Sequence, residues 1–229
     1  MNILKEINKK QDQYKKDTDF NNLFTLIKDY DHYILGGFIR DIFEKKQSKD
    51  IDILIDISDE NLFEIVKNFK YKKNSFGAYK LILNNIEVDI WNTTNHFYFK
   101  NLMYEYKKGD LKNIANTCFI NYDALIYYPN KENYYVRPFF NAKRKGVKFI
   151  RSKHKTYIST NLTKITNTLK LLLIQEKYKL NKNVIKYINE NLKTYKKQDF
   201  VDAINKYEKY QSLTEKINKI YENEISETK

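Results

Sequence analysis

Residues 32–56, HYILGGFIRDIFEKKQSKDIDILID, decide how this chain folds. The stretch opens with the apolar residues 33–35, turns at Gly36 and Gly37, and continues with apolar residues at helical spacing as far as Phe43. It ends in a second apolar run that carries two aspartates. This pattern predicts a strand, a glycine turn, a helix and a second strand.

The glycine turn is the first candidate for a binding site. The whole chain has five glycines, so two in succession at a junction between strand and helix are a strong feature. A residue without a side chain lets a bulky group approach the backbone closely. The free amides at a helix N-terminus suit an anion such as a phosphate. We therefore expect Gly36 and Gly37 to form a phosphate-binding turn.

The second strand supplies a pair of carboxylates. Asp50 and Asp52 are two residues apart, and alternate residues of a strand project from the same face. Like charges at this spacing repel, and a divalent cation removes that penalty. Mg²⁺ binds carboxylate oxygens together with substrate phosphates, so the stretch combines the parts needed for phosphoryl transfer.

A plainer interpretation of the same residues is open. The glycines could make only a tight turn and the aspartates only a solvated strand end, with Arg40 paired to Asp41 or Glu44.

The motif also resembles a known family. Gly-Gly-x-Ile-Arg-Asp, eight further residues and Asp-x-Asp is similar to the head-domain signature of the class II branch of the polymerase-beta nucleotidyltransferase superfamily. That branch contains the CCA-adding tRNA nucleotidyltransferases and the bacterial poly(A) polymerases. The matching positions are Gly36, Gly37, Arg40, Asp41, Asp50 and Asp52.

The resemblance implies a role for each of these residues. Asp50 and Asp52 would bind two Mg²⁺ ions, with Mn²⁺ as an alternative metal. Gly36 and Gly37 would cradle the β- and γ-phosphates of an NTP, with ATP favoured. Arg40 would support the phosphates or the ribose. Asp41 would fix Arg40 or the glycine turn.

A third carboxylate is expected from a β-hairpin further along the chain. Residues 79–83 and 86–91 flank an Asn-Asn pair that favours a two-residue turn. A two-metal mechanism needs a third acid, and in the family that acid follows a Phe-Gly turn, as Asp89 follows Phe76-Gly77. We expect Asp89 to complete the metal and catalytic set, with Glu87 in reserve. A charged, solvent-facing hairpin edge would look the same.

The chain departs from the family pattern at the segment near the triphosphate. Asn121 matches a family asparagine close to the incoming nucleotide, although it could simply cap the run 124–128. Residues 115–117 are Ala-Asn-Thr where the family has Arg-Arg-Asp. Lys112 or Lys80 would have to compensate for the missing charge.

Base recognition is expected to differ as well. Asn161 and Lys164 stand where the family has an Asp and an Arg that hydrogen-bond to the incoming base. An Asn can read a base edge because it carries both a donor and an acceptor. A Lys cannot reproduce the planar fork of an Arg. Base selection should therefore differ from that of a CCA-adding enzyme, or be looser.

The predicted fold is α+β: a nucleotidyltransferase head over residues 1–150, with a mixed, mostly antiparallel sheet flanked by helices, and a helical neck-like domain over 151–229. Apolar stripes predict head helices at 18–30 and 59–69 and several helices after residue 161. Residues 1–16 look like a frayed helix or an arm. Residues 134–140 look like an edge strand stopped by Pro138. The basic run 143–148 could follow an RNA backbone or be a solvated loop.

Composition sets limits on the partners and the compartment. Forty-two Lys and Arg against 29 Asp and Glu give a net charge of +13, which attracts polyanions such as nucleic acid. Drift of an A+T-rich coding sequence would produce the same bias. The single Cys118 excludes an internal disulfide framework. No apolar run approaches the length needed to span a membrane, so we expect no membrane partner and a cytoplasmic protein.

Three functions remain open at this point. The first is template-independent transfer of NMP from an NTP to an RNA 3′-hydroxyl, as in tRNA nucleotidyltransferases and poly(A) polymerases, with tRNA among the candidate acceptors. The second is transfer of AMP to a protein or small molecule. The third is a non-catalytic basic subunit. Family members continue into body and tail domains that hold tRNA, so a partner chain could supply those domains.

Overall fold

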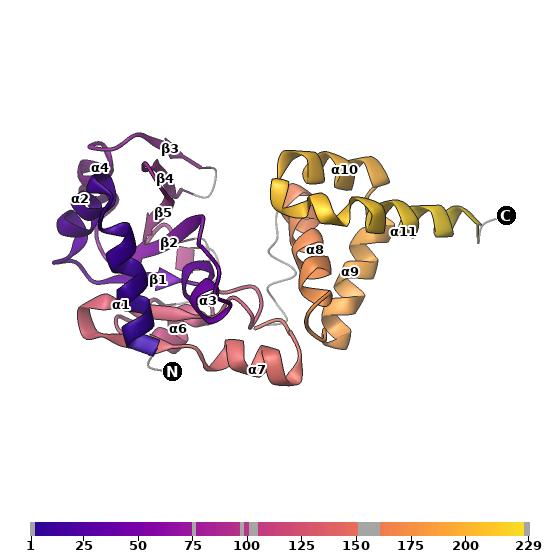
Figure 1. The fold of residues 1–229 in the computed structure, drawn as a ribbon, viewed down its shortest axis with the longest axis horizontal. Helices are drawn as coiled ribbons and strands as arrows, with labels where there is room; N and C mark the ends of the chain where they lie inside the picture. Colours follow the sequence, from indigo (N-terminus) through magenta and orange to yellow (C-terminus); the bar gives the residue numbers. More distant parts are fainter. Residues whose placement is uncertain (1–2, 75–76, 97–98, 101–104, 151–160, 227–229) are drawn as a thin grey trace. The chain divides into compact units, whose positions relative to one another are not determined.

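The computed structural model describes residues 3–74, 77–96, 99–100, 105–150 and 161–226 (Figure 1). The chain divides into two compact units, Met1–Phe140 and Asn141–Lys229. The boundary predicted at 150–151 lies further along the chain. Each unit is described by itself.

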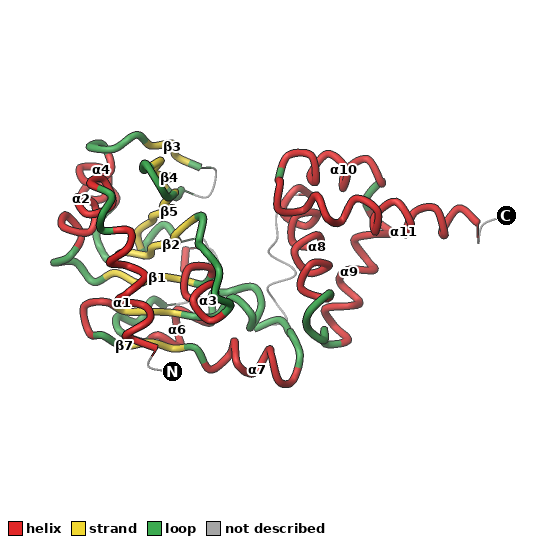
Figure 2. The backbone as a smooth tube through the Cα atoms, viewed as in Figure 1, coloured by secondary structure: helices red, strands yellow, loops and turns green. Residues whose placement is uncertain are grey.

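The first unit is built on a seven-stranded sheet with the order β3-β4-β5-β2-β1-β6-β7 (Figure 2). Its strands are β1 (His32–Leu35), β2 (Asp50–Ile55), β3 (Tyr71–Lys73), β4 (Tyr79–Ile82), β5 (Glu87–Asn92), β6 (Ile126–Tyr128) and β7 (Asn133–Tyr135). Only β2 and β5 pair in parallel among these strands, and every other neighbouring pair is antiparallel. The predicted mixed, mostly antiparallel sheet is confirmed.

The motif stretch forms the centre of this sheet. All four residues of β1 are buried, and Ile51, Ile53 and Ile55 of β2 have no exposed surface. Helix α3 (Gly37–Phe43) connects the two strands and buries Phe38 and Ile39. The predicted order of strand, glycine turn, helix and strand is thereby confirmed, and apolar burial explains it.

Helices flank the sheet, as expected. They are α1 (Ile3–Tyr14), α2 (Thr18–Ile27), α4 (Asp59–Val66) and α6 (Leu111–Ala115). The helices α2 and α4 lie together on one side of the sheet (Figure 1). The carboxylate of Asp17 caps α2 by accepting hydrogen bonds from the backbone amides of Asp19 and Phe20.

The N-terminal segment is a packed helix and not an arm. In α1 the side chains of Ile7, Gln11 and Tyr14 are buried at intervals of three and four residues, which is helical spacing. The helix contacts α3. The interpretation as a loose arm is wrong, because the sparse apolar residues of this stretch all fall on one helical face.

The interpretation of residues 134–140 as an edge strand is also wrong beyond its first residues. Strand β7 ends at Tyr135, and helix α7 (Arg137–Lys145) follows. Pro138 lies in the first turn of that helix, where its missing N–H costs nothing. Part of the basic run thus belongs to the last helical turn, where cations complement the helix dipole.

The second unit is helical, as predicted. It contains α8 (Asn161–Gln175), α9 (Lys182–Thr194), α10 (Lys197–Lys206), the 3₁₀ helix η3 (Glu208–Leu213) and α11 (Thr214–Ser226). The amide of Asn191 donates a buried hydrogen bond of 2.9 Å to the hydroxyl of Thr168, which ties α9 to α8. The hydroxyl of Tyr221 donates to the carbonyls of Leu192 and Tyr195.

Across the described ranges, no helix has both the length and the apolar character that crossing a membrane requires.

Candidate active site

The glycine turn after β1 has a backbone that favours glycine. Gly36 has φ +50° and donates its amide to the carbonyl of Leu125 at 2.8 Å. A Cβ at this position would lie 3.3 Å from the carbonyl oxygen of Asp123. Gly37 follows as the first residue of α3, and a Cβ there would meet only the ends of two side chains at ordinary contact distance. The turn is therefore closely packed at Gly36 and open at Gly37.

A row of charged residues crosses the sheet toward this turn. In the strand register Lys80 pairs with Asp89, Asp89 pairs with Asp52, and Asp52 pairs with Leu35, the residue before Gly36. Directly paired residues on neighbouring strands project from the same face of a sheet. The sheet thus brings Asp52 and Asp89 together, as the sequence predicted, and places Lys80 beside them.

Asp50 lies one step further along the same face. It pairs with Glu87, and its Oδ1 lies 3.8 Å from the position that a Cβ on Gly37 would take. The first aspartate of the motif is therefore the one that borders the glycine turn. Asp50 and Glu87 are both exposed, whereas Asp52 and Asp89 are half-buried.

Asp89 lies in an unusual electrostatic environment. Its Oδ2 forms an ion pair with the Lys80 ammonium at 3.2 Å. Its Oδ1 is buried and has no hydrogen-bond partner among the described residues. Burial raises the pKa of Asp89, the Lys80 charge opposes that rise, and the nearby Asp50 and Glu87 carboxylates add to it. An orphaned buried carboxylate oxygen is a free ligand for a cation.

Lys80 bridges the two candidate third acids. Its ammonium contacts Glu87 at 2.9 Å as well as Asp89 at 3.2 Å. Burial lowers the pKa of Lys80, but the hydrogen bond to Glu87 and the charge of Asp89 outweigh burial and leave that pKa raised. The lysine therefore stays charged and neutralises part of the acidic cluster.

The donor set of this face suits a hard divalent cation, since it consists of carboxylate oxygens. Within the described part of the chain, no three His, Cys, Asp or Glu side chains are already gathered closely enough to hold a metal ion. The fit therefore rests on the shared face of Asp50, Asp52 and Asp89 and on the orphaned Oδ1 of Asp89.

The Arg40 guanidinium lies beside the glycine turn and is anchored by Asp123, a residue that the sequence pattern did not indicate. Its Nη1 donates to Oδ1 of Asp123 at 2.6 Å, and its guanidinium carbon lies 5.0 Å from the ring centre of Tyr122. Burial lowers the pKa of Arg40, but the Asp123 carboxylate outweighs it and the pKa is raised. The main partner of Arg40 is thus Asp123, and Asp41, at 4.0 Å, is a weaker one. The signal available in sequence was an arginine directly after the apolar residues Phe38 and Ile39, which needs a carboxylate partner where the fold buries it.

Asp41 ties α3 to the loop that precedes the aspartate strand. Its Oδ2 accepts a hydrogen bond from the hydroxyl of Ser48 at 3.1 Å, and its Oδ1 lies 4.0 Å from Nε of Arg40. The ammonium of Lys10 in α1 donates to the same Ser48 hydroxyl at 2.8 Å, and the Tyr14 hydroxyl donates to the Ser48 carbonyl at 2.9 Å. Helix α1 therefore helps to hold the residue two places before Asp50.

The segment predicted near the triphosphate is packed inward. Asn121 is 2% exposed, and Ala115 and Thr117 are 2% and 4% exposed. The hydroxyl of Thr117 donates to the Ile114 carbonyl at 2.7 Å, closing the end of α6. These residues carry none of the charge of an Arg-Arg-Asp segment. Lys112, which was expected to compensate for that charge, is exposed.

The predicted base-reading residues belong to the second unit. Lys164 is half-buried in α8, and its carbonyl accepts a hydrogen bond from the Thr168 hydroxyl at 2.9 Å. The side chain of Asn161 lies outside the described residues, as do Phe76 and residues 151–160. A nucleotide-binding role for Asn161 and Lys164 stays a prediction.

The stretch that carries the glycine turn and the three aspartates resembles a known domain. Residues 32–125 match the sequence profile described as the poly A polymerase head domain. The match begins at the first residue of β1 and spans the glycine turn, Asp50, Asp52 and Asp89. Residues 32–125 therefore resemble a poly A polymerase head domain. No curated protein matches the sequence.

Solved structures of the same fold match a longer part of this chain than the head-domain profile does. A CCA-adding enzyme in complex with ATP is 13% identical with a TM-score of 0.55, and the match covers 80% of this chain and 45% of that one. The Thermotoga maritima CCA-adding enzyme complexed with tRNA is 13% identical with a TM-score of 0.57, covering 86% and 49%. A tRNA nucleotidyltransferase with a primer tRNA and an incoming ATP analogue is 15% identical with a TM-score of 0.54, covering 83% and 61%. This chain therefore spans between 45% and 61% of their lengths, and at such identities the likeness confirms the nucleotidyltransferase fold.

Proposed function

We propose that this protein is a template-independent, metal-dependent nucleotidyltransferase that transfers NMP from an NTP to the 3′-hydroxyl of an RNA. The proposal is supported by the match of residues 32–125 to the poly A polymerase head domain and by solved structures of similar fold that hold ATP, CTP or tRNA. ATP is the favoured donor, and tRNA is one candidate acceptor. A partner chain could supply the domains that hold tRNA in longer relatives.

One observation carries the proposal: Asp52 and Asp89 are direct neighbours in the parallel pair β2 and β5, while Asp50 borders Gly37. This arrangement gives three carboxylates on one face beside an open turn. Gly36 and Gly37 would leave room for the β- and γ-phosphates of the NTP. Arg40, held by Asp123, would stand close by as a fixed positive charge.

Asp50 and Asp52 would hold both Mg²⁺ ions, and Asp89 would complete the ion that serves the attacking hydroxyl. Bound Mg²⁺ would lower the pKa of that hydroxyl and neutralise charge on the leaving pyrophosphate. Lys80 now pairs with Asp89 and Glu87 and would be free to turn toward the triphosphate once a cation neutralises Asp89.

The test is incubation of the protein with Mg²⁺, each NTP separately and a short labelled RNA, with product length measured on a gel. Wild type should extend the RNA. The Asp50→Asn/Asp52→Asn variant should not, although its circular dichroism should match wild type because the substitution also relieves charge repulsion. Extension by this variant would rule out the proposal.

A second function is favoured by one specific observation. Ala115 and Thr117 are buried, and residues 115–117 carry no charge where the family has Arg-Arg-Asp, so the contacts to the triphosphate or acceptor would differ from those of RNA-extending relatives. Transfer of AMP to a protein or small molecule would fit such a change. Radiolabelled ATP offered with RNA and cell lysate side by side distinguishes the two, since labelled protein without labelled RNA would replace the first proposal with the second.

A further inference from the structure

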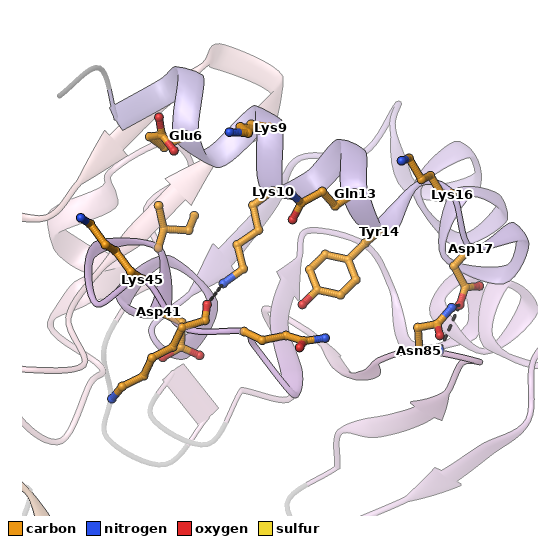
Figure 3. Close-up of a pocket in the computed structure, with 13 residues that line it drawn as sticks. Glu6, Lys9, Lys10, Gln13, Tyr14, Lys16, Asp17, Asp41, Lys45 and Asn85 are labelled. Atoms are coloured by element: carbon orange, nitrogen blue, oxygen red, sulfur yellow. Dashed lines mark hydrogen bonds between the residues drawn. The ribbon is translucent and has the colours of Figure 1, made fainter.

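A basic cleft lies between helix α1 and the loop that leads into strand β2 (Figure 3). Its volume is about 640 Å³, and five lysines and three acidic residues are among its lining residues. Helix α1 precedes the stretch that matches the head domain, so one wall of this cleft is not part of the family match. We call this space the α1 cleft.

Two of the three acidic residues already accept hydrogen bonds from the protein. The Asp17 carboxylate accepts from two backbone amides of α2 and from the backbone and side-chain amides of Asn85. The Asp41 carboxylate accepts from Ser48 and lies near Arg40 and Lys10. These carboxylates therefore help to hold the walls of the α1 cleft in place, and the five lysines outnumber the three acidic residues, so the lining keeps a net positive charge.

Three of the lysines are available to a ligand. Lys9, Lys16 and Lys45 are exposed, and none has an ion-pair partner within the portion of the chain that the structure describes. The other two are engaged, since Lys10 donates to the Lys46 carbonyl and to Ser48, and Lys46 pairs with Glu44. The α1 cleft thus presents three free cations above a fixed floor.

The shape and lining of the α1 cleft favour a phosphate backbone over a free nucleotide. Its aromatic lining residue, Tyr14, is 8% exposed and uses its hydroxyl on the Ser48 carbonyl, so it offers no face on which a base could stack. Base recognition usually needs such an aromatic platform. Lysines without a base platform bind phosphates and position a strand without reading its sequence.

The α1 cleft also adjoins the reactive end of the sheet. Residues 45–47 line the cleft and lead through Ser48 to Asp50, and Asn85 lines it and precedes Glu87 at the start of β5. The starts of β2 and β5 carry the carboxylates of the candidate active site. A nucleic-acid strand bound along the α1 cleft would therefore run close to those carboxylates.

We propose that the α1 cleft binds the sugar-phosphate backbone of the acceptor RNA, through Lys9, Lys16 and Lys45, just upstream of its 3′ end. This inference rests on the proposed function for the identity of the RNA as acceptor. It assigns the positioning of that RNA to a helix outside the family match.

The test compares two variants of the full chain in a binding assay without NTP. One is Lys9→Gln/Lys16→Gln/Lys45→Gln, and its matched control is Lys28→Gln/Lys70→Gln/Lys131→Gln, which changes three exposed lysines that do not line the α1 cleft. Fluorescence anisotropy with labelled single-stranded oligo(A) and oligo(U) measures affinity over a range of salt concentrations. Thermal melting of both variants checks that the fold is kept.

The cleft variant should bind both oligonucleotides about tenfold or more weakly at 0.1 M salt, and the slope of log affinity against log salt should fall by about 2, since about 0.7 counterion is released per phosphate contact on a single strand. The affinity and the salt slope of the control variant should both fall by less. Equal losses in both variants would overturn the inference, and so would a cleft variant that loses poly-glutamate binding but keeps RNA binding, because the surface would then serve an acidic protein.

Binding without transfer keeps this inference separate from the proposed function. A wild-type protein that binds RNA through the α1 cleft but never extends it would contradict the proposed function alone. A protein that extends RNA equally well with and without the three lysines, at RNA concentrations below saturation, would contradict only the inference that the α1 cleft binds the acceptor RNA.

Discussion

Asp52 and Asp89 are direct neighbours on the sole parallel strand pair of the described sheet, although 37 residues separate them along the chain. Their shared register places two half-buried carboxylates on one face, with the Lys80 ammonium on one side and Leu35, the residue before the glycine turn, on the other.

The two glycines of the turn should respond differently to alanine. Gly36→Ala should lower the free energy of unfolding by about 2 kcal/mol, because φ is +50° and the new Cβ would lie 3.3 Å from a backbone carbonyl. Gly37→Ala should leave stability nearly unchanged but raise the KM for NTP, since its Cβ would enter the open side of the turn. Urea denaturation and steady-state kinetics measure both. A Gly37→Ala enzyme with an unchanged KM would count against a phosphate at this turn.

The pair between Arg40 and Asp123 should behave as a buried ion pair. Asp123→Asn should destabilise the protein by about 3 kcal/mol, because it leaves a largely buried guanidinium without its carboxylate. Arg40→Met/Asp123→Leu should recover part of that loss by removing both charges. A double-mutant cycle in urea gives the coupling free energy. If Asp123→Asn melted like wild type, the carboxylate would not be the anchor of Arg40.

Much of the head could be predicted because its signals are local. Apolar periodicity and the glycine pair are enough for β1, α3 and β2, and the Asn-Asn turn is enough for the hairpin of β4 and β5. The parallel pairing of β2 with β5 could not be derived from periodicity, since strand partners far apart in sequence leave no local pattern.

Other features were hidden for equally physical reasons. Strand β3 is exposed throughout and so carries no alternation of apolar residues. Helix α7 was mistaken for a strand because its proline sits in the first turn, where proline is tolerated. Asp123 as the partner of Arg40 depends on a contact across 83 residues.

Helix α1 should contribute to the stability of the loop before Asp50. Tyr14→Phe should lower the free energy of unfolding by about 1 kcal/mol, because the Ser48 carbonyl loses a buried hydrogen bond of 2.9 Å. Tyr134→Phe, which alters an exposed ring in β7, should change it by less than about 0.5 kcal/mol. Equal effects in urea denaturation would mean that the Tyr14 hydroxyl does not hold the loop.

His96 should make the first unit sensitive to mild acid. Burial against the rings of Trp91 and Phe99 lowers the pKa of His96 from 6.5 to about 4. Between these values the unfolded chain binds the proton and the folded chain does not, so stability is present above pH 6.5 and is lost as the pH falls toward 4. The expected loss between pH 8 and pH 5 is about 2 kcal/mol.

The variant His96→Phe isolates this contribution, because it keeps an aromatic ring and removes the titration. The difference in the free energy of unfolding between wild type and His96→Phe should vary with pH by that amount. A constant difference between pH 8 and pH 5 would mean that the imidazole is protonated equally in both states. His32, whose pKa burial also lowers, remains in both proteins and cancels in the comparison.

The most direct measurement compares Asp89→Asn with Glu87→Gln, two substitutions that each remove one negative charge from β5 and from contact with Lys80. Single-turnover incorporation of NMP into a short RNA should fall more than about 100-fold in Asp89→Asn, because even residues that only orient metal ligands cost 10- to 100-fold. Glu87→Gln should stay within about fivefold of wild type, as expected for an exposed ion pair that contributes little. Full activity in Asp89→Asn, or an equal loss in both variants, would contradict the account that Asp50, Asp52 and Asp89 form the catalytic set.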